Sequence, residues 1–252
     1  MEELNSIAII SDIHGNYTAL ENVLKKIEMY DEQINDIMCL GDLVGYNPEP
    51  EKCVNKIREV CSKVIAGNHD KAMVGELNIQ WFRETVKKSI TWTRDHLSED
   101  SKSYLKSLNT REDLSINGRK IILAHGSPDQ NSPFSYIFNR YDIKAIEPLI
   151  MDTNILFIGH THIPFCFCNK GDGWQQIEKD EIEINPEYNY IVNVGSVGQP
   201  RDRDPRLSFV IFNPDNNLLT FHRYEYNIKE VQDKFAKTDL PEEFSLRLAQ
   251  GR

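Results

Sequence analysis

The chain has 252 residues, of which 40% are hydrophobic and 10% aromatic, enough to bury the core of one large domain spanning residues 1–252. The net charge of −10 argues against a protein that coats DNA or an anionic membrane, although a local basic patch could still hold a phosphate. The sequence shows neither a membrane-spanning apolar run of roughly 18 residues nor the basic and apolar regions of a signal peptide, so we expect a soluble cytoplasmic protein.

The first third of the chain alternates predicted strands and helices. Short apolar runs at residues 7–10, 37–40 and 63–66 predict three strands. Apolar residues at helical spacing follow the first two runs, and Asn47 and Pro48 resemble the N-cap and first residue of the second helix. This order predicts a parallel sheet covered by helices on both faces, with ligands gathered at the carboxyl ends of the strands.

The remaining two thirds contain more strands than helices. A polar stretch with a helical period that starts at Trp81 predicts two helices, which would form a small cap around residues 80–108. Segments 114–116 and 120–124 flank Asn117 and Gly118, a two-residue hairpin turn. We expect a helix over 142–150, a peripheral helical segment over 228–248, and strands at 155–158, 163–168, 190–194, 207–212 and 218–223.

Five clusters of Asp, Asn, His and Gly directly follow predicted strands. They are residues 11–16 (SDIHGN), 41–46 (GDLVGY), 67–70 (GNHD), 124–126 (AHG) and 159–162 (GHTH). Strand ends of this kind meet at one edge of the fold. That edge would hold seven candidate ligands: Asp12, His14, Asp42, Asn68, His125, His160 and His162.

The ligand types indicate the kind of metal. Carboxylate and imidazole together suit a first-row transition metal such as Mn, Fe, Zn or Ni, whereas calcium prefers oxygen ligands alone. Seven ligands are too many for one ion, but two ions fit if Asp42 bridges them through its two oxygens. Taken singly, each cluster is explained by turn chemistry or a hydrogen-bonded histidine. The repetition of the pattern after five strands favours a metal site.

The five clusters, in this order, resemble those of the calcineurin-like metallophosphoesterases, and the resemblance extends from Ile9 to about Phe212. It implies an α/β fold of two packed mixed β-sheets flanked by helices, a four-layer sandwich. It implies two divalent or mixed-valence metal ions, one held by Asp12, His14, Asp42 and His162, the other by Asp42, Asn68, His125 and His160. It also implies that His69 meets the phosphoryl group or leaving oxygen and that Asp70 orients the ring of His69.

One departure from the family pattern narrows the group of family members that this sequence resembles. Serine/threonine phosphatases of the family usually carry Asp-Arg-Gly shortly after the Gly-Asp pair, but here Asp42 is followed by Leu-Val-Gly-Tyr-Asn-Pro, which argues against a phosphoprotein substrate. The sequence is more similar to small bacterial and archaeal members described as phosphodiesterases or diadenosine-tetraphosphatase-like, in which a segment like residues 195–201 (GSVGQPR) recurs.

The resemblance predicts metal-dependent hydrolysis of a small, nucleotide-like phosphate ester by activated water. Monoester and diester substrates both remain open, as do the metal and the oligomeric state. A metal-dependent nuclease and a non-catalytic binding scaffold on the same fold are the alternatives. The acidic composition argues against a nucleic-acid partner, and the complete ligand set with His69 argues against a scaffold.

The loop at residues 195–206 has two interpretations. It is either a solvated turn in which Arg201, Arg203 and Arg206 pair with Asp202 and Asp204, or part of the substrate site. The candidate ligands include no positively charged side chain, so a guanidinium nearby would supply bidentate contact to phosphate. Arg201 and Arg206 are therefore candidate substrate-binding residues, and their positions favour Arg201.

Overall fold

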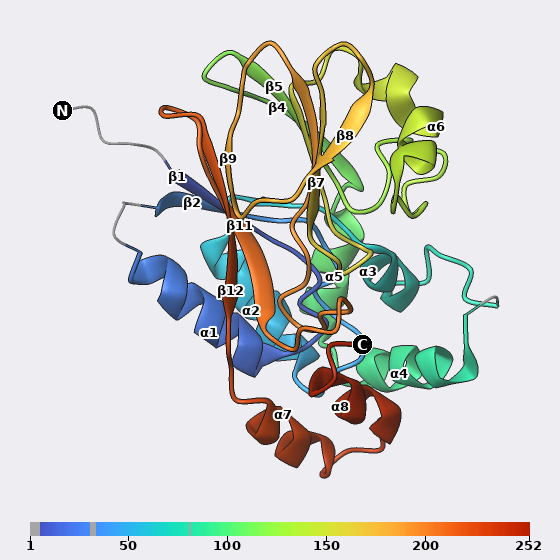
Figure 1. Ribbon diagram of the computed structural model, residues 1–252. Helices are drawn as coiled ribbons and strands as arrows, with labels where there is room; N and C mark the ends of the chain where they lie inside the picture. Colours follow the sequence, from blue (N-terminus) through green and yellow to red (C-terminus); the bar gives the residue numbers. More distant parts are fainter. Residues whose placement is uncertain (1–5, 31–33, 81) are drawn as a thin grey trace.

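Two mixed six-stranded sheets form the centre of the fold (Figure 1). The computed structural model describes residues 6–30, 34–80 and 82–252. In the first sheet the strand order is β3-β2-β1-β11-β12-β9, and in the second it is β4-β5-β6-β10-β7-β8. The first sheet contains β1 (Ser6–Ile10), β2 (Ile34–Cys39), β3 (Lys63–Val64), β9 (Glu181–Glu183), β11 (Leu207–Asn213) and β12 (Leu218–Tyr224). The second contains β4 (Arg111–Ile116), β5 (Arg119–Ala124), β6 (Ile155–Ile158), β7 (Phe165–Asn169), β8 (Trp174–Ile177) and β10 (Asn189–Asn193).

Helices cover the outer faces of the two sheets. They are α1 (Tyr17–Glu28), α2 (Pro50–Val60), α3 (Asn68–Met73), α4 (Glu84–Asp95), α5 (Glu99–Ser107), α6 (Arg140–Ile150), α7 (Ile228–Phe235) and α8 (Glu242–Leu248). Apolar residues of every helix except α6 form one core with the outer face of the first sheet. Helix α6 packs on the outer face of the second sheet (Figure 1). None of the helices in the described ranges is both long and apolar enough to cross a membrane.

The inner faces of the two sheets pack against each other. Side chains alternate along β1, so Ile7 and Ile9 face the core between the sheets while Ala8 and Ile10 face the helices. Across that core the rings of Phe157 and Phe212, one from each sheet, lie 6.1 Å apart. The four-layer α/β sandwich is thus confirmed. The expectation of helices on both faces of the first sheet is wrong, because an apolar strand face can be buried equally well by a second sheet.

Pairing directions explain why so many carboxyl ends meet. β1 pairs in parallel with β2, and β2 with β3, whereas β1 pairs antiparallel with β11. In the second sheet β6 pairs in parallel with β5 and β10, and β7 pairs antiparallel with β10. The sheets are therefore mixed, and β1, β2 and β3 end at one edge while β5 and β6 end together in the other sheet.

The remaining differences from the expected elements are local. Helix α2 begins at Pro50 after Glu49, two residues later than Asn47 and Pro48 suggested. The segment 228–248 forms two helices, since Pro241 precedes α8. The two helices expected between residues 80 and 108 are α4 and α5, and both pack against α3, while Trp81 lies outside the described residues. Elements α3, β8 and β9 were not expected, because segments of three to six residues carry too few apolar positions to show a period.

Candidate metal centre

The structure brings the candidate ligands together at the carboxyl ends of β1, β2, β5 and β6 and at the start of α3. Within each of two buried groups, the ligand atoms lie within 4.8 Å of one another. The first group is Asp12, His14, Asp42 and His162, and the second is Asp42, His125 and His160. The Oδ1 atom of Asn68 is also buried and has no hydrogen-bond partner among the described residues. Asp42 belongs to both groups.

Five of the candidate ligands have a left-handed backbone. They are Asp12 (φ 55°), His14 (φ 50°), Asp42 (φ 52°), His160 (φ 66°) and His162 (φ 61°). This conformation is uncommon outside glycine, and a sparsely populated conformation costs on the order of 1–3 kcal/mol. Loop hydrogen bonds hold it, among them the N–H of His14 to the carbonyl of Asp42 (2.8 Å) and that of Gly198 to the carbonyl of Asp12 (2.9 Å). The scaffold thus accepts local strain to aim these side chains at one place.

Each of the two carboxylates divides its oxygens between backbone and cluster. Asp12 accepts the N–H of His160 on Oδ2 at 2.9 Å, while its Oδ1 lies 3.2 Å from Nε2 of His162. Asp42 accepts the N–H of His69 on Oδ1 at 2.8 Å. Its Oδ2 lies 3.5 Å from Nε2 of His14 and 3.3 Å from Nε2 of His125. Oδ2 of Asp42 thus faces both groups, and bridging of two ions through both oxygens of Asp42 stays a prediction.

Four histidines each place one ring nitrogen on a backbone carbonyl. The pairs are His14 Nδ1 with Val44 (3.1 Å), His125 Nδ1 with Leu40 (2.7 Å), His160 Nε2 with Phe134 (3.0 Å) and His162 Nδ1 with Gln199. A carbonyl only accepts, so each of these nitrogens carries the proton and the other ring nitrogen of the neutral imidazole is a lone pair. The Nε2 atoms of His14 and His162 face each other at 3.1 Å. Two lone pairs this close repel, and a cation held by both histidines would remove the repulsion.

Burial and mutual charge shape the ionisation of the cluster. Burial lowers the pKa of His160 to about 3 and that of His69 to about 4. Burial alone would raise the pKa of Asp42, but His125 and neighbouring imidazoles hold it well below its usual range. Against burial, Asp42 raises the pKa of His125 to about 9, so a proton and a metal ion compete for its Nε2. Ionised carboxylates and neutral imidazoles are the forms that bind divalent cations. The two carboxylates and the rings of His14, His160 and His162 are in these forms, and His125 reaches its binding form when it loses its proton, so these residues fit two such ions.

His69 lies beside the cluster, but Asp70 does not orient it. The ring of His69 lies 4.8 Å from that of His14 and 4.5 Å from that of Tyr46. Its Nδ1 has no partner within the described part of the chain. Asp70 instead accepts the N–H groups of Leu43 (2.9 Å), Val44 (3.3 Å) and Gly67 (2.9 Å). The expected role of Asp70 is therefore corrected, because its carboxylate joins the loop after β2 to the turn before α3.

The structure brings Arg201 to the cluster. The backbone N–H of Arg201 donates to the carbonyl of His162 at 3.2 Å. Its guanidinium donates to Oε1 of Gln199 at 2.8 Å and lies 5.6 Å from the centre of the Tyr46 ring. Burial lowers the pKa of His162, and the charge of Arg201 lowers it further, so the cation acts directly on a candidate ligand.

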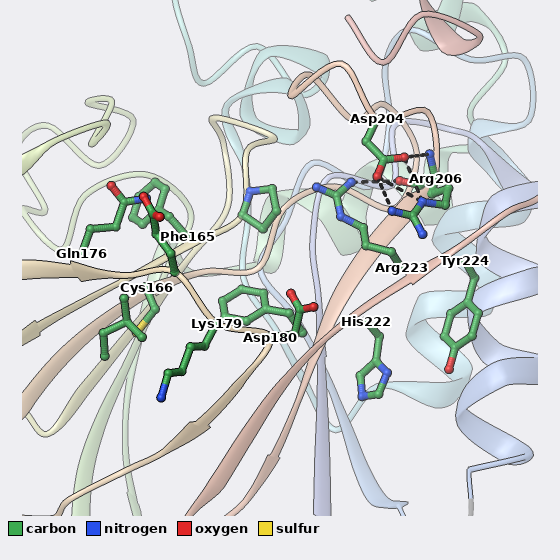
Figure 2. A pocket seen from close by; sticks show the side chains of 14 residues that line it. Phe165, Cys166, Gln176, Lys179, Asp180, Asp204, Arg206, His222, Arg223 and Tyr224 are labelled. Atoms are coloured by element: carbon green, nitrogen blue, oxygen red, sulfur yellow. Dashed lines mark hydrogen bonds and ion pairs between the residues drawn. The ribbon is translucent and has the colours of Figure 1, made fainter.

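Arg206 is paired with a carboxylate away from the cluster of candidate ligands. It forms an ion pair with Asp204 at 2.6 Å, as the structural interpretation of this loop expected. Both residues line a cavity of about 640 Å³ between β7, β8 and β12, shown in Figure 2. None of the seven candidate ligands is among the described residues lining this cavity. The candidate role of Arg206 in substrate binding therefore finds no support, since its guanidinium already has a carboxylate partner away from the cluster.

Two tyrosines that lie beside the cluster were not predicted from the sequence. Tyr46 is buried, has a left-handed backbone (φ 61°) and contacts the rings of His14 and His69. Tyr136 stacks on His160 with ring centres 4.0 Å apart. Tyr46 ends the GDLVGY cluster, which was a usable signal. Tyr136 lies in a loop ten residues beyond the nearest cluster, where the sequence gives no indication of its place.

A four-layer sandwich with a buried Asp/His cluster at its strand ends is the arrangement of the metallophosphoesterases. Residues 6–217 match the family described as the calcineurin-like phosphoesterase superfamily domain. An uncharacterized protein from Methanocaldococcus jannaschii is 35% identical over 246 residues, which cover 98% of each chain. This chain belongs to the calcineurin-like metallophosphoesterase superfamily.

Two further proteins are similar to this chain, one in structure and one in sequence. The crystal structure of a metallophosphoesterase from Sphaerobacter thermophilus superposes with a TM-score of 0.84 and 36% sequence identity, covering 98% of this chain and 99% of that one. A symmetrical bis(5'-nucleosyl)-tetraphosphatase from Buchnera aphidicola is 26% identical over 176 residues, 67% of this chain and 59% of that protein. The first supports the fold over its whole length, and the second is a more distant similarity.

Proposed function

We propose that this protein hydrolyses a small, nucleotide-like phosphate ester with the help of two divalent transition-metal ions. The observation that carries the proposal is the position of Asp42, whose Oδ2 faces both groups of candidate ligands. In this proposal Asp12, His14, Asp42 and His162 hold one ion, and Asp42, Asn68, His125 and His160 hold the other. When bound, two such ions would polarise the phosphoryl oxygens and make a water molecule more acidic.

His69 is the proposed acid or hydrogen-bond donor. Its backbone N–H is already used by Asp42, so only its ring is free to act on substrate. The ring lies beside that of His14, and its Nδ1 has no partner among the described residues. From this position a ring N–H can stabilise charge that develops on a phosphoryl oxygen or protonate the leaving oxygen. This chemistry requires no serine or cysteine nucleophile.

Arg201 is the proposed contact for the negative charge of the substrate. Gln199 and the ring of Tyr46 hold the guanidinium at the edge of the cluster. A planar guanidinium held in this way can offer two parallel N–H groups to a phosphate. Arg206 has no part in the proposal, because it pairs with Asp204.

A nucleotide-like substrate is supported by the similarity to the symmetrical bis(5'-nucleosyl)-tetraphosphatase. The lack of Asp-Arg-Gly after Asp42 supports a small ester rather than a phosphoprotein. The net charge of −10 disfavours the nuclease alternative, and the full ligand set with His69 disfavours a scaffold that has lost its chemistry. Phosphomonoesters and phosphodiesters of nucleosides are the substrates to test first.

Two substitutions test the proposal together. Asp42→Ala removes the carboxylate shared by both groups, so metal content and turnover should both fall to near zero. His69→Asn should keep most of the metal but lose about 10²- to 10⁴-fold in turnover, most severely for esters with poor leaving groups. Metal content is measured by mass spectrometry of the purified variants and turnover with a panel of phosphate esters.

The pair of variants also shows which part of the proposal fails. Full metal occupancy in Asp42→Ala, or hydrolysis by protein stripped with a chelator, contradicts the metal assignment. Loss of both metals in His69→Asn identifies His69 as a ligand rather than a donor to the substrate. An ester panel that yields no hydrolysis with metal-loaded wild-type protein contradicts the enzymatic proposal as a whole.

A further inference from the structure

Three aromatic rings form a nearly parallel series that starts at a candidate ligand and ends in solvent. The ring of Tyr136 stacks on that of His160, with centres 4.0 Å apart and planes inclined by 14°. The ring of Phe138 follows at 5.3 Å from Tyr136, again inclined by 14°. We call Tyr136 and Phe138 the aromatic platform. The proposed chemistry at the metal centre gives these two residues no role.

The exposure of the platform is built into the loop between β5 and α6. Tyr136 is 49% exposed and Phe138 is 50% exposed. Between them Ile137 is only 2% exposed and belongs to the core that joins α6 to the second sheet. Because the side chain of Ile137 is fixed in that core, its two neighbours are turned away from it. The fold therefore presents two stacked aromatic side chains to solvent beside a candidate ligand.

The loop that carries the platform is anchored on both sides. The N–H of Ser127 donates to the carbonyl of Pro133 at 2.9 Å, and His160 donates to the carbonyl of Phe134 at 3.0 Å. Beyond the platform, the N–H of Phe138 donates to Oδ2 of Asp142 at 2.9 Å, in the first turn of α6. A surface fixed before binding loses little conformational freedom when a ligand stacks on it.

The platform and the proposed phosphate contact are both held at the GHTH segment. Tyr136 stacks on His160, and the backbone N–H of Arg201 donates to the carbonyl of His162 at 3.2 Å. Tyr136 and Arg201 therefore contact candidate ligands only two residues apart.

We propose that the aromatic platform stacks the nucleobase of a nucleoside phosphate ester on the outer face of Phe138, which Tyr136 supports from behind, while the phosphoryl group is held at the metal centre. This inference rests on the proposed function and specifies its substrate class. Every nucleobase has a flat π face, and stacking on an aromatic side chain strengthens binding by roughly fivefold or more per base. The platform would therefore select for a base without requiring a particular one.

Calorimetry on manganese-loaded protein tests the proposal directly. The probes are adenosine 5'-monophosphate and inorganic phosphate, which share the phosphoryl group and differ in the nucleoside. Wild-type protein should bind the nucleotide more tightly than phosphate. In Tyr136→Leu and Phe138→Leu that preference should shrink by roughly fivefold or more, and Tyr136→Phe should restore it. Tyr141→Leu is the matched control, because Tyr141 is 73% exposed in α6 and its ring stacks on no other aromatic ring among the described residues.

The outcomes separate the platform from the metal centre. An unchanged preference in both leucine variants overturns the inference, as does wild-type protein that binds the two probes equally. If Tyr136→Leu weakens both probes to the same extent and loses metal, Tyr136 only positions His160, and the inference also fails. A nucleotide preference that depends on the platform, in protein that hydrolyses no ester, would support the platform and contradict the proposed hydrolysis instead.

Discussion

The proposed role of Arg201 in substrate binding is based on its contacts rather than on its charge alone. Four arginines lie in or beside the loop before β11, and three of them carry different partners. Arg206 pairs with Asp204, and Arg223 pairs with Asp202. Arg201 has no carboxylate partner among the described residues and contacts the amide of Gln199 and the ring of Tyr46 instead. A guanidinium without an anionic partner, next to a cluster of metal ligands, remains available for an anionic substrate.

We expect Arg201→Ala to raise KM for phosphate esters several-fold or more with metal content unchanged, because the ligands contribute no other positive side chain. Arg203→Ala is the matched control, since Arg203 is exposed and lies two residues further along the same loop. Steady-state kinetics and metal analysis of both variants check this expectation. Equal and negligible effects of the two substitutions would show that this loop serves structure alone.

At the scale of elements, the metal centre depends on loops from different sheets approaching each other closely. Gly159 follows β6 of the second sheet, and Asp12 follows β1 of the first. A Cβ built on Gly159 would collide with Oγ of Ser11 and lie 2.5 Å from Oδ2 of Asp12. The hydrogen bond from His160 to that same oxygen also needs this approach. Glycine is used here because the two loops leave no room for a side chain.

Gly159→Ala should therefore weaken metal binding about 10- to 100-fold, as changes in the groups that support metal ligands typically do. Competition with a chromogenic chelator measures the affinity. Gly118→Ala is the control, because Gly118 has a left-handed backbone (φ 76°) in the β4–β5 turn and nothing lies within 4 Å of its added Cβ. The control should lose about 1 kcal/mol of unfolding free energy and keep its metal affinity. An unchanged metal affinity in Gly159→Ala would mean that the loops after β1 and β6 can move apart without a cost in free energy.

At the scale of the whole molecule, the core between the two sheets holds the two halves of the site in place. Ligands after β1 and β2 belong to the first sheet, and those after β5 and β6 to the second. Phe157 and Phe212 meet in the core between the sheets and are 1% and 0% exposed. Packing of the two sheets is therefore a condition for assembling the cluster.

Phe157→Ala should lower the free energy of unfolding by about 3–5 kcal/mol, through lost burial and the cavity left behind. Urea denaturation followed by circular dichroism measures the change. Met151→Ala, at a position 72% exposed, should stay within about 0.5 kcal/mol of the wild-type value. A loss below about 1 kcal/mol in Phe157→Ala would show that this ring contributes little to the packing of the sheets.

The sequence by itself determined which residues gather and at which end of the strands. Short apolar runs form strands for local reasons, and a polar cluster directly after a strand must lie at its carboxyl end. This logic predicts Asp12, Asp42, His125 and His160 at the strand ends, and the fold has them there. Local patterns alone predicted helices on both faces of the first sheet. The resemblance to the family predicted a second sheet on one of those faces instead.

Only the tertiary structure decided which atoms meet within the gathered set. Asp70 accepts three backbone N–H groups instead of orienting the ring of His69. Arg206 pairs with Asp204, and Tyr136 reaches His160 from a distant loop. The ends of the strands follow from the periodicity of apolar residues and from strand pairing. Both patterns recur along the chain, so they can be predicted from the sequence. Loop contacts depend on single backbone angles and on residues remote in sequence, so they exist only once the two sheets have packed.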